Sequence, residues 1–389
     1  MYVYKPDKCR VPIKVWQEKG AVEQGALDQI ELTAQLPFAF HHVALMPDAH
    51  QGYGMPIGGV FAAEGVVLPY FVGVDIGCGM CAVKTTHILE KDYEDDVKTI
   101  MSAVRDSIPL GRDHHKDGQE WIGFDEAPDI KVIQSELASA RRQLGTLGGG
   151  NHFIEVQVDE DNYVWLMLHS GSRNFGFKIA KEYHARAQEH CEKWHVSLPD
   201  KDLAFLPIGE CADTTEYLDA MNFALKFAEA SRALMMERFV TAANSVWSFY
   251  VEDPINIHHN YAAIENHFGK NVWVHRKGAT SAREGQLGII PGSQGTASYI
   301  VEGLGNSESF MSCSHGAGRT MSRSKARAEL DLEAEKKMLD DQGIVHSIRS
   351  QGDLDEAPSA YKDIENVMEQ EKDLVKIVAK LRPIGVVKG

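Results

Sequence analysis

The sequence predicts a mixed α/β fold in which a β-sheet core is flanked by helices. Three observations support this prediction. Short apolar segments punctuated by glycine alternate with longer segments of helical periodicity. The composition, 43% hydrophobic and 25% charged, is that of an ordinary globular protein. No Pro/Ser-rich linker divides the chain, so we expect one compact domain that spans residues 1–389.

The first half of the chain alternates apolar segments with polar ones. Glycine-punctuated apolar segments predict strands at 41–47, 58–69, 71–75, 152–158 and 163–169. Residues 89–107 have the pattern of a helix, and residues 110–130 form a polar loop rich in Gly, Asp and His. The last two strands follow the glycine run at 148–150, and an acidic turn separates them.

The second half begins with two predicted helices, 176–196 and about 215–247. In the second helix Phe223, Phe227, Leu234 and Phe239 keep near-helical spacing, which predicts a face that packs in the core. Strand and loop segments follow from 251 to 320. The charged stretch 323–342 predicts an exposed helix with i,i+4 pairs, and 362–381 predicts another helix.

Charge and cysteine usage limit the class of protein. No apolar run approaches the roughly 18 residues that a membrane span needs, and the N-terminus lacks the apolar stretch of a secretory signal. The six cysteines are scattered, as in reduced cytosolic proteins, so we expect a cytoplasmic protein without a membrane partner. A net charge of −16 argues against broad duplex binding but leaves local recognition of a phosphate end open.

Residues that can bind metals recur next to glycine at the ends of apolar strands. They are Asp75, Cys78, His152, His169, His258, His259 and His315. A histidine at such a position is placed like a functional group rather than like a solvated surface residue. Thiolate, imidazole and carboxylate together suit zinc, manganese, iron or cobalt. A thiolate can bridge two ions, so these residues predict a dinuclear site with open positions for substrate oxygens.

Three glycine-rich segments indicate phosphate binding. They begin at Thr146, Pro291 and His315, and each can turn successive backbone N–H groups toward an anion. The sequence contains no GxxxxGK[ST] loop, no Rossmann GxGxxG after a strand and no KxDG ligase motif. A nucleotide, if one binds, is therefore held in some other way.

Other residues of the same types allow more than one interpretation. Cys78 and Cys81 form a CxxC, either a redox pair or half of a zinc site. His184, Cys191 and His195 share one helix face, which predicts either a second metal site or a partly buried face. His41, His42 and His50 flank the PDAH turn, and we expect them to position it.

Nine segments taken together resemble the RtcB family of RNA-splicing ligases. They are PDAHQGYGMPIGG (47–59), VGVDIGCGM (72–80), LGTLGGGNHFIE (144–155), LHSGSR (168–173), HHNY (258–261), RKGA (276–279), PGSQGTASY (291–299), SHGAGRTMSR (314–323) and AYKDIENVM (360–368). They occur in the family's order, and the resemblance runs from about residue 10 to the terminal Lys388-Gly389.

The resemblance implies two Mn²⁺ ions and GTP as co-substrate. Asp75, Cys78 and His152 would hold one ion, and Cys78, His169 and His259 the other. His315 would be the nucleophile. The implied nucleotide contacts are Asn151, His152, Phe153, Ile154, Glu155, His259, Asn260, Pro291, Gly292, Ser293, Gln294, Ser298, Gly316, Ala317, Gly318 and Lys388. Asp48 is a candidate for placing an RNA 5′-hydroxyl.

The activity that the resemblance implies joins RNA ends through a guanylylated histidine. A 2′,3′-cyclic phosphate or 3′-phosphate end would be activated with GMP and joined to a 5′-hydroxyl end, in tRNA splicing or RNA repair. RNA ends and GTP are the expected partners, and an archease-type activator is a further candidate. Gln294 stands where many relatives have Met, and the 110–130 loop departs from the family's pattern.

Three other functions use some of the same residues. A binuclear metal-dependent phosphodiesterase needs the Asp, Cys and His ligands but neither GTP nor a histidine nucleophile. A metal-dependent RNA-end-binding module needs no turnover. An end-capping enzyme guanylylates a 3′-phosphate without joining it. Covalent GMP on the protein after incubation with GTP and manganese separates the first two from a ligase.

Overall fold

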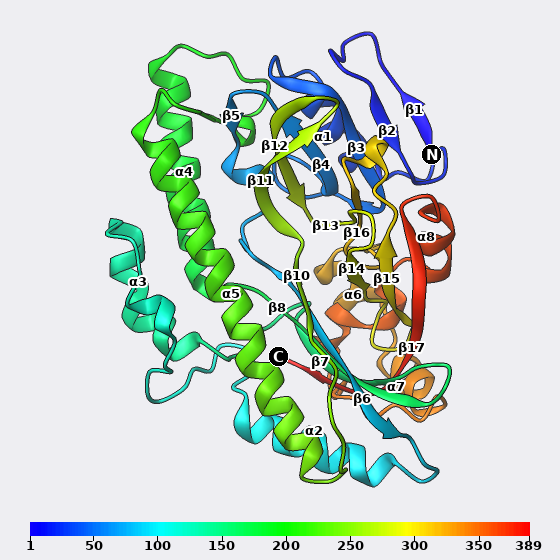
Figure 1. Cartoon of the computed structure of the whole chain (residues 1–389). Coiled ribbons are helices and arrows are strands. Elements are labelled where there is room, and N and C mark those ends of the chain that lie inside the picture. The colour runs from blue at the N-terminus through cyan, green and yellow to red at the C-terminus, as the bar shows by residue number, and fades with distance from the viewer.

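The computed structural model describes residues 1–389 and confirms a mixed α/β fold. Its N-terminal part is built on a six-stranded sheet in the order β1-β2-β3-β4-β12-β11, seen at the upper right of Figure 1. These strands are β1 Tyr2–Tyr4, β2 Ile13–Val15, β3 Ala39–His50, β4 Ile57–Ala63, β11 Asn260–His267 and β12 Lys270–Lys277. Only β2 and β3 pair in parallel, and the other neighbours are antiparallel.

A seven-stranded antiparallel sheet forms the second layer, in the order β10-β6-β8-β7-β17-β15-β14. Its strands are β6 Gly79–Ile88, β7 Phe153–Val158, β8 Tyr163–Ser170, β10 Ile255–His258, β14 Leu287–Ile290, β15 Ser298–Gly303 and β17 Val375–Lys388. Two small sheets accompany it, β13 (Ala279–Ser281) with β16 (Ser312–Ser314) and β5 (Val66–Val67) with β9 (Leu206–Pro207). Strands distant in sequence therefore meet in the middle of the molecule (Figure 1).

Helices cover the outer faces of the sheets. The helices are α1 Gln24–Thr33, α2 Glu94–Ser107, α3 Lys131–Gln143, α4 Arg173–Lys193, α5 Ala212–Asn244, α6 Arg323–Glu329, α7 Leu332–Asp340 and α8 Ile364–Gln370. The long helices α4 and α5 lie side by side along the left of Figure 1, with α3 against α4. Helices α2 and α5 pack on the seven-stranded sheet, which encloses a core of aliphatic and aromatic side chains.

The apolar face predicted for 215–247 is confirmed in α5. Phe223, Phe227 and Phe239 are buried, and Leu234 is partly buried against the same cluster as Phe227. None of the eight helices is long and apolar enough to cross a bilayer.

Several element predictions are confirmed and others are wrong. The strands expected at 41–47, 152–158 and 163–169 form, as do both long helices. The strand expected at 71–75 does not form: Phe71 ends a short 3₁₀ helix, Pro69–Phe71, and residues 72–75 lie in a turn, because Pro69 precedes the apolar run and Gly73 interrupts it with a positive φ. The stretch 323–342 divides into α6 and α7, because Asp331 caps a new helix through the backbone N–H of Ala334.

The helix predicted for 362–381 is the largest error. Only Ile364–Gln370 is helical, and residues from Val375 onward form strand β17. Alternating β-branched residues in this strand pair with β7 on one side and β15 on the other, which outweighs the charged, helix-like composition. The apolar residues 384–387 belong to the same strand.

Candidate active site

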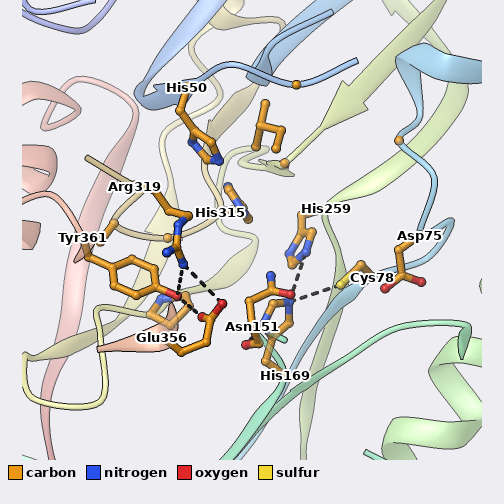
Figure 2. Close-up of a pocket in the computed structure, with 18 of the residues that line it drawn as sticks. His50, Asp75, Cys78, Asn151, His169, His259, His315, Arg319, Glu356 and Tyr361 are labelled. Atoms are coloured by element: carbon orange, nitrogen blue, oxygen red, sulfur yellow. Dashed lines mark hydrogen bonds and ion pairs between the residues drawn. The ribbon is translucent and has the colours of Figure 1, made fainter. Parts of the chain in front are cut away.

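A cavity of about 770 Å³ lies between the two large sheets and is lined by glycine-rich turns. Its lining comes from the 50–53 and 73–78 turns, the starts of β7 and β11, the 291–294 and 315–323 segments, Glu356, Tyr361 and Lys388. Figure 2 shows imidazoles, carboxylates and one thiol directed into this space. The volume is within the range of nucleotide-sized ligands.

Strand register brings the predicted metal ligands to one end of the seven-stranded sheet. Gly79 of β6 lies opposite both Ser170 of β8 and His258 of β10, while His169 lies opposite Phe153 of β7. Residues next to these pairs, Cys78, His152 and His259, therefore converge. Gly171 must lack a side chain, because a Cβ there would collide with the carboxylate of Asp75.

The converging side chains form one contiguous cluster. The Sγ of Cys78 is 3.2 Å from Nε2 of His169 and 3.5 Å from Nε2 of His152. Nε2 of His169 is 3.4 Å from Nε2 of His259, and Nε2 of His152 is 3.3 Å from Oδ2 of Asp75. These distances are typical of ligands around shared cations, and the cluster contains all five predicted metal ligands.

Hydrogen bonds fix the tautomers of two of these histidines. Nδ1 of His152 donates to the carbonyl of Leu147 at 3.0 Å, and Nδ1 of His169 donates to the carbonyl of Asn151 at 3.1 Å. Their Nε2 lone pairs therefore face the cluster without protons. Burial, reinforced by neighbouring histidines, holds the pKa of His169 and of His259 well below the ordinary value, so both imidazoles are neutral.

The cluster fits divalent cations, because its polar atoms do not satisfy one another by hydrogen bonds. The unprotonated Nε2 of His169 faces Nε2 of His259, and Nδ1 of His259 is buried without a partner. Burial, aided by Asp75, raises the pKa of the Cys78 thiol well above its usual value, so a cation is needed to hold a thiolate there. Asp75 accepts from the backbone N–H of Ser172 at 3.1 Å, which aims its other oxygen at His152.

Arg232 of α5 supports this end of the sheet from behind. Its side chain is fully buried, and its Nη1 donates to the carbonyls of Gly77 and Ser170. Its Nη2 lies 3.0 Å from Nδ1 of His258, which directs His258 away from the cavity. His258 therefore does not join the cluster, although its sequence context matches that of its neighbour His259.

His315 lies on the neighbouring wall, just after β16. Its Nδ1 is 2.6 Å from Oδ2 of Asp48, whose carboxylate is fully buried, and its ring centroid is 4.8 Å from that of His259. Burial alone would raise the pKa of Asp48, but the charge and hydrogen bond of His315 bring it below the ordinary value. Because a carboxylate only accepts, Nδ1 carries the proton in the neutral imidazole, and Nε2 then keeps its lone pair.

The turn after His315 is held close to Asp48. Gly318 has φ 74°, and a Cβ there would collide with the carbonyl of Asp48, so only glycine allows this approach. Lys362 donates to the carbonyls of Pro47 and Ala49, at 3.1 and 2.6 Å. These contacts hold the backbone around Asp48 in place. The carboxylate of Asp48 in turn orients the ring of His315.

A third group surrounds Glu356, which sequence reasoning missed. Its carboxylate accepts from Arg323 at 2.8 Å and from Arg319 at 3.2 Å, and the hydroxyl of Tyr361 also donates to it. Nζ of Lys388 lies 3.6 Å away. The two arginines and the tyrosine stand in the SHGAGRTMSR and AYKDIENVM motifs, but no motif contains Glu356.

Most of the predicted nucleotide contacts lie along the cavity. Those that line it are Asn151, Phe153, Glu155, His259, Asn260, Pro291, Gly292, Ser293, Gln294, Gly316, Ala317, Gly318 and Lys388. Ile154, Ser298 and His152 do not line it. Ile154 points into the core on the opposite face of β7, and Ser298 accepts from Gln157 behind the wall.

The side-chain amide of Gln294 is engaged within the protein and is not directed toward a nucleotide. Its Nε2 donates to the carbonyl of Glu356 at 2.8 Å, and the side chain is buried. The amide thus ties the 291–294 turn to the segment that carries Glu356. Its amide oxygen remains buried without a partner.

The other cysteine and histidine patterns have structural explanations. Cys81 packs in the core while Cys78 faces the cavity, and both are free, so the two do not form a pair. His184 stacks on Tyr70 with ring centroids 3.3 Å apart, and Cys191 contacts the carbonyl of Phe205. His195 lies beyond the end of α4 and is exposed, so these three residues form no metal cluster.

Comparison with known proteins agrees with the motifs. The family model described as tRNA-splicing ligase RtcB matches residues 29–127 and 120–389. The RNA-splicing ligase RtcB of Escherichia coli K12 is 41% identical, over 97% of this chain and 97% of its own. The tRNA-splicing ligase RtcB of Pyrobaculum aerophilum is 33% identical over 98% and 95%, and the Mycobacterium tuberculosis RNA-splicing ligase RtcB is 31% identical over 93% and 100%. The chain belongs to the RtcB family of tRNA-splicing ligases.

Proposed function

We propose that this protein is a GTP- and Mn²⁺-dependent RNA ligase that joins 2′,3′-cyclic phosphate or 3′-phosphate ends to 5′-hydroxyl ends. One observation carries the proposal: the His315–Asp48 pair lies directly beside the Cys78 cluster in a nucleotide-sized cavity. A hydrolase needs only the cluster. A histidine with a protonated Nδ1 and a free Nε2 is what a covalent histidine mechanism needs in addition.

The cluster is assigned to two manganese ions. Asp75, Cys78 and His152 would hold one, and Cys78, His169 and His259 the other. When bound, these ions supply positive charge that stabilises phosphoryl oxygens and keeps the neighbouring imidazoles neutral. A mixed thiolate, imidazole and carboxylate set does not suit magnesium or calcium, whose ligands are oxygens.

The first step is guanylylation of His315. Nε2 attacks the α-phosphorus of GTP, an N–P bond forms, and the bond to pyrophosphate breaks. The imidazole then carries a positive charge, because Nδ1 keeps its proton. The buried carboxylate of Asp48, 2.6 Å away, compensates that charge without reorganising solvent. His315 is 16% exposed, which leaves Nε2 accessible to a ligand in the cavity.

The second and third steps transfer GMP and join the ends. A cyclic phosphate end is first opened by water to a 3′-phosphate. An oxygen of this 3′-phosphate attacks the phosphorus of GMP, the N–P bond breaks, and His315 is restored. The 5′-hydroxyl of the second strand then attacks the activated 3′-phosphate, and GMP leaves. The histidine thus acts twice, once as nucleophile and once as leaving group.

The charge of the cavity differs from that of the whole chain. Although the net charge of the chain is −16, the cavity lining has as many basic side chains as carboxylates: Lys277, Arg319, Arg323 and Lys388 against Glu23, Asp75, Glu155 and Glu356. Guanidinium groups bind phosphate oxygens well. Arg319 and Arg323 converge on the carboxylate of Glu356, and a phosphate group can take over these hydrogen bonds or bridge the two arginines. RNA is therefore bound at its ends rather than along a basic surface.

Intact-mass spectrometry after incubation with GTP and Mn²⁺ tests the proposal. We expect one covalent GMP per chain, released by acid because it is held through an N–P bond. Addition of a 3′-phosphate RNA should discharge it, and addition of a 5′-hydroxyl RNA should give a joined product. No adduct together with turnover of a phosphodiester would show a hydrolase. An adduct that only caps the 3′ end would show a capping enzyme.

A further inference from the structure

A second cluster of metal-binding side chains lies at the junction of α4 and α5, outside the cavity. His190 is in the last turn of α4, while Cys211 and Asp213 are at the start of α5. Nε2 of His190 is 2.7 Å from Oδ2 of Asp213 and 3.5 Å from Sγ of Cys211, and all three groups are half-buried. None of the three lines the cavity.

The geometry distinguishes a metal site from an activated thiol. In a nucleophilic Cys–His–Asp arrangement the thiol and the carboxylate contact opposite nitrogens of the imidazole. Here both approach the same nitrogen, Nε2, so the three ligand atoms converge on one point. Convergence of sulfur, nitrogen and oxygen is what a cation requires.

The distances are close to those of a tetrahedral zinc site. With Zn–S of about 2.3 Å and Zn–N of about 2.0 Å, two tetrahedral ligands lie about 3.5 Å apart, as Cys211 and His190 do. The corresponding N···O separation is about 3.3 Å, so Asp213 has to move by roughly half an ångström. The movement is small because only its Oδ2 faces His190.

The surrounding charges also favour a cation. Arg186 donates to Oδ1 of Asp213 at 2.9 Å, to Glu216 at 3.0 Å and to Glu182 at 3.0 Å. One guanidinium therefore faces three carboxylates, and it occupies the oxygen of Asp213 that is turned away from the cluster. The three carboxylates outnumber the one guanidinium, so the local charge is negative.

We propose that His190, Cys211 and Asp213 bind one Zn²⁺-type divalent ion, with water as fourth ligand. The ion would tie the C-terminal end of α4 to the N-terminal end of α5 and close the 194–211 connection. That connection carries Asp202, whose backbone packs against Gly54 of the cavity rim. The site is structural, and it is independent of the proposed ligase activity.

Cysteine burial makes the site testable with Co²⁺. Of the six cysteines, only Cys211 is not buried, so it is the accessible thiol outside the cavity. In a Cys78→Ala chain, Co²⁺ should still give thiolate-to-cobalt charge-transfer absorption, with about one equivalent bound. Adding Cys211→Ser should abolish that absorption. Adding Cys191→Ser, which changes the residue next to His190 in α4 and whose sulfur faces the carbonyl of Phe205, should leave it unchanged.

Zinc affinity provides a second measurement in the otherwise unaltered chain. Asp213→Asn and His190→Ala should each weaken binding of this one zinc equivalent at least tenfold in competition with a chelator. His195→Ala, an exposed histidine five residues from His190, should leave the affinity unchanged. The proposal is overturned if the Cys78→Ala chain shows no thiolate absorption, if that absorption survives Cys211→Ser, or if Asp213→Asn and His195→Ala behave alike.

Discussion

The two walls of the cavity hold histidine in different ways. On the sheet wall, Nδ1 of His152 and of His169 donates to a backbone carbonyl. On the neighbouring wall, Nδ1 of His315 donates to the buried carboxylate of Asp48. All three rings are fixed as the same tautomer, with Nε2 free, but only His315 has a full negative charge behind it.

The difference follows from the charge that each imidazole must carry. A metal ligand stays formally neutral, so a carbonyl dipole is enough to orient it. An imidazole that forms a bond to phosphorus becomes cationic, and in a buried site that charge needs a counter-ion. In the proposed mechanism, the carboxylate therefore marks the histidine whose charge changes during the reaction.

Removal of the nucleophile has the largest expected effect. His315→Ala should abolish covalent GMP capture, because no other imidazole combines a free Nε2 with a counter-ion in the cavity. The fold and the metal content should be retained, since His315 is not among the predicted ligands. Intact mass, circular dichroism and metal analysis measure these three properties. An alanine variant that still carries acid-labile GMP would contradict the assignment.

Removal of the bridging ligand should have the next largest effect. Cys78→Ala is expected to lower manganese content by more than one equivalent, because its thiolate would serve both ions. His169→Ala should mainly empty one site. Metal analysis after gel filtration measures both variants, with Cys81→Ala as a control that removes a core thiol of the same strand region. Equal losses in Cys78→Ala and His169→Ala would exclude a bridge.

Neutralising the counter-ion Asp48 should slow GMP capture without loss of manganese from the cluster. Asp48→Asn retains the shape of the side chain but removes its charge and allows the wrong tautomer of His315. We expect the single-turnover rate of GMP capture to fall by about two to four decades. Manganese content should not change. A rate within threefold of the unaltered protein would show that the carboxylate only orients the ring.

Lys388 should affect nucleotide choice more than chemistry. Its backbone pairs with Phe153, and its ammonium lies 3.6 Å from Glu356 and over the Phe153 ring at 5.6 Å, so the end of β17 is fixed in the cavity. An ammonium can donate to the guanine oxygen, and a charge-assisted hydrogen bond contributes about 1.5–3 kcal/mol. Lys388→Met should therefore weaken GTP use by about one to two decades.

Comparison of GTP with ATP sharpens that test. Adenine has no oxygen at the corresponding position, so Lys388→Met should also erode the preference for GTP over ATP in guanylylation and adenylylation of His315. Lys380→Met is the matched control, because Lys380 lies on the same strand but pairs with Glu365 at the surface. Unchanged rate and unchanged preference in Lys388→Met would leave this lysine with a purely structural role.

The sequence predicted the ligand types better than their surroundings. Glycine-flanked Asp75, Cys78 and His315 were recognisable because a polar residue between a strand and a tight turn has a local pattern. Glu356 and Arg232 have no such pattern, since their roles depend on contacts with residues far away in the chain. His258 and His259 share one motif, and only the pairing of β10 with β6 decides which of them faces the cavity.

The same limit applies to the fold. The long helix α5 was predictable from its periodicity, whereas β17 was mistaken for a helix because its charged residues alternate across a strand paired on both sides. The spacing of His184, Cys191 and His195 indicated one face of α4 as a metal site. The cluster that forms uses His190, which is next to Cys191 and lies on the adjacent helix face. Which helix face meets α5 is set by packing, and periodicity does not determine it.

The smallest expected effect concerns a second buried acid behind His315. Glu371 accepts from the backbone N–H of Ser314 at 2.9 Å, and no cation faces it, so burial raises its pKa to about 8. Asp48 on the same wall is ionised because His315 faces it. The wall thus contains one charged and one neutral carboxyl group, and only the charged one is expected to act on the nucleophile.

A pH series separates these two acids. Because the pKa of Glu371 is raised in the folded state, its contribution to stability is present at low pH and is lost as pH rises toward 8. Between pH 6 and 8 the unaltered, metal-free protein should lose about 2 kcal/mol of unfolding free energy that Glu371→Gln does not lose. Urea unfolding at the two pH values measures this, and the remaining titrating groups cancel in the comparison. Parallel stability profiles for the two proteins would mean that Glu371 is ionised in the folded state. Burial at this wall would then not be enough to keep a carboxyl group neutral.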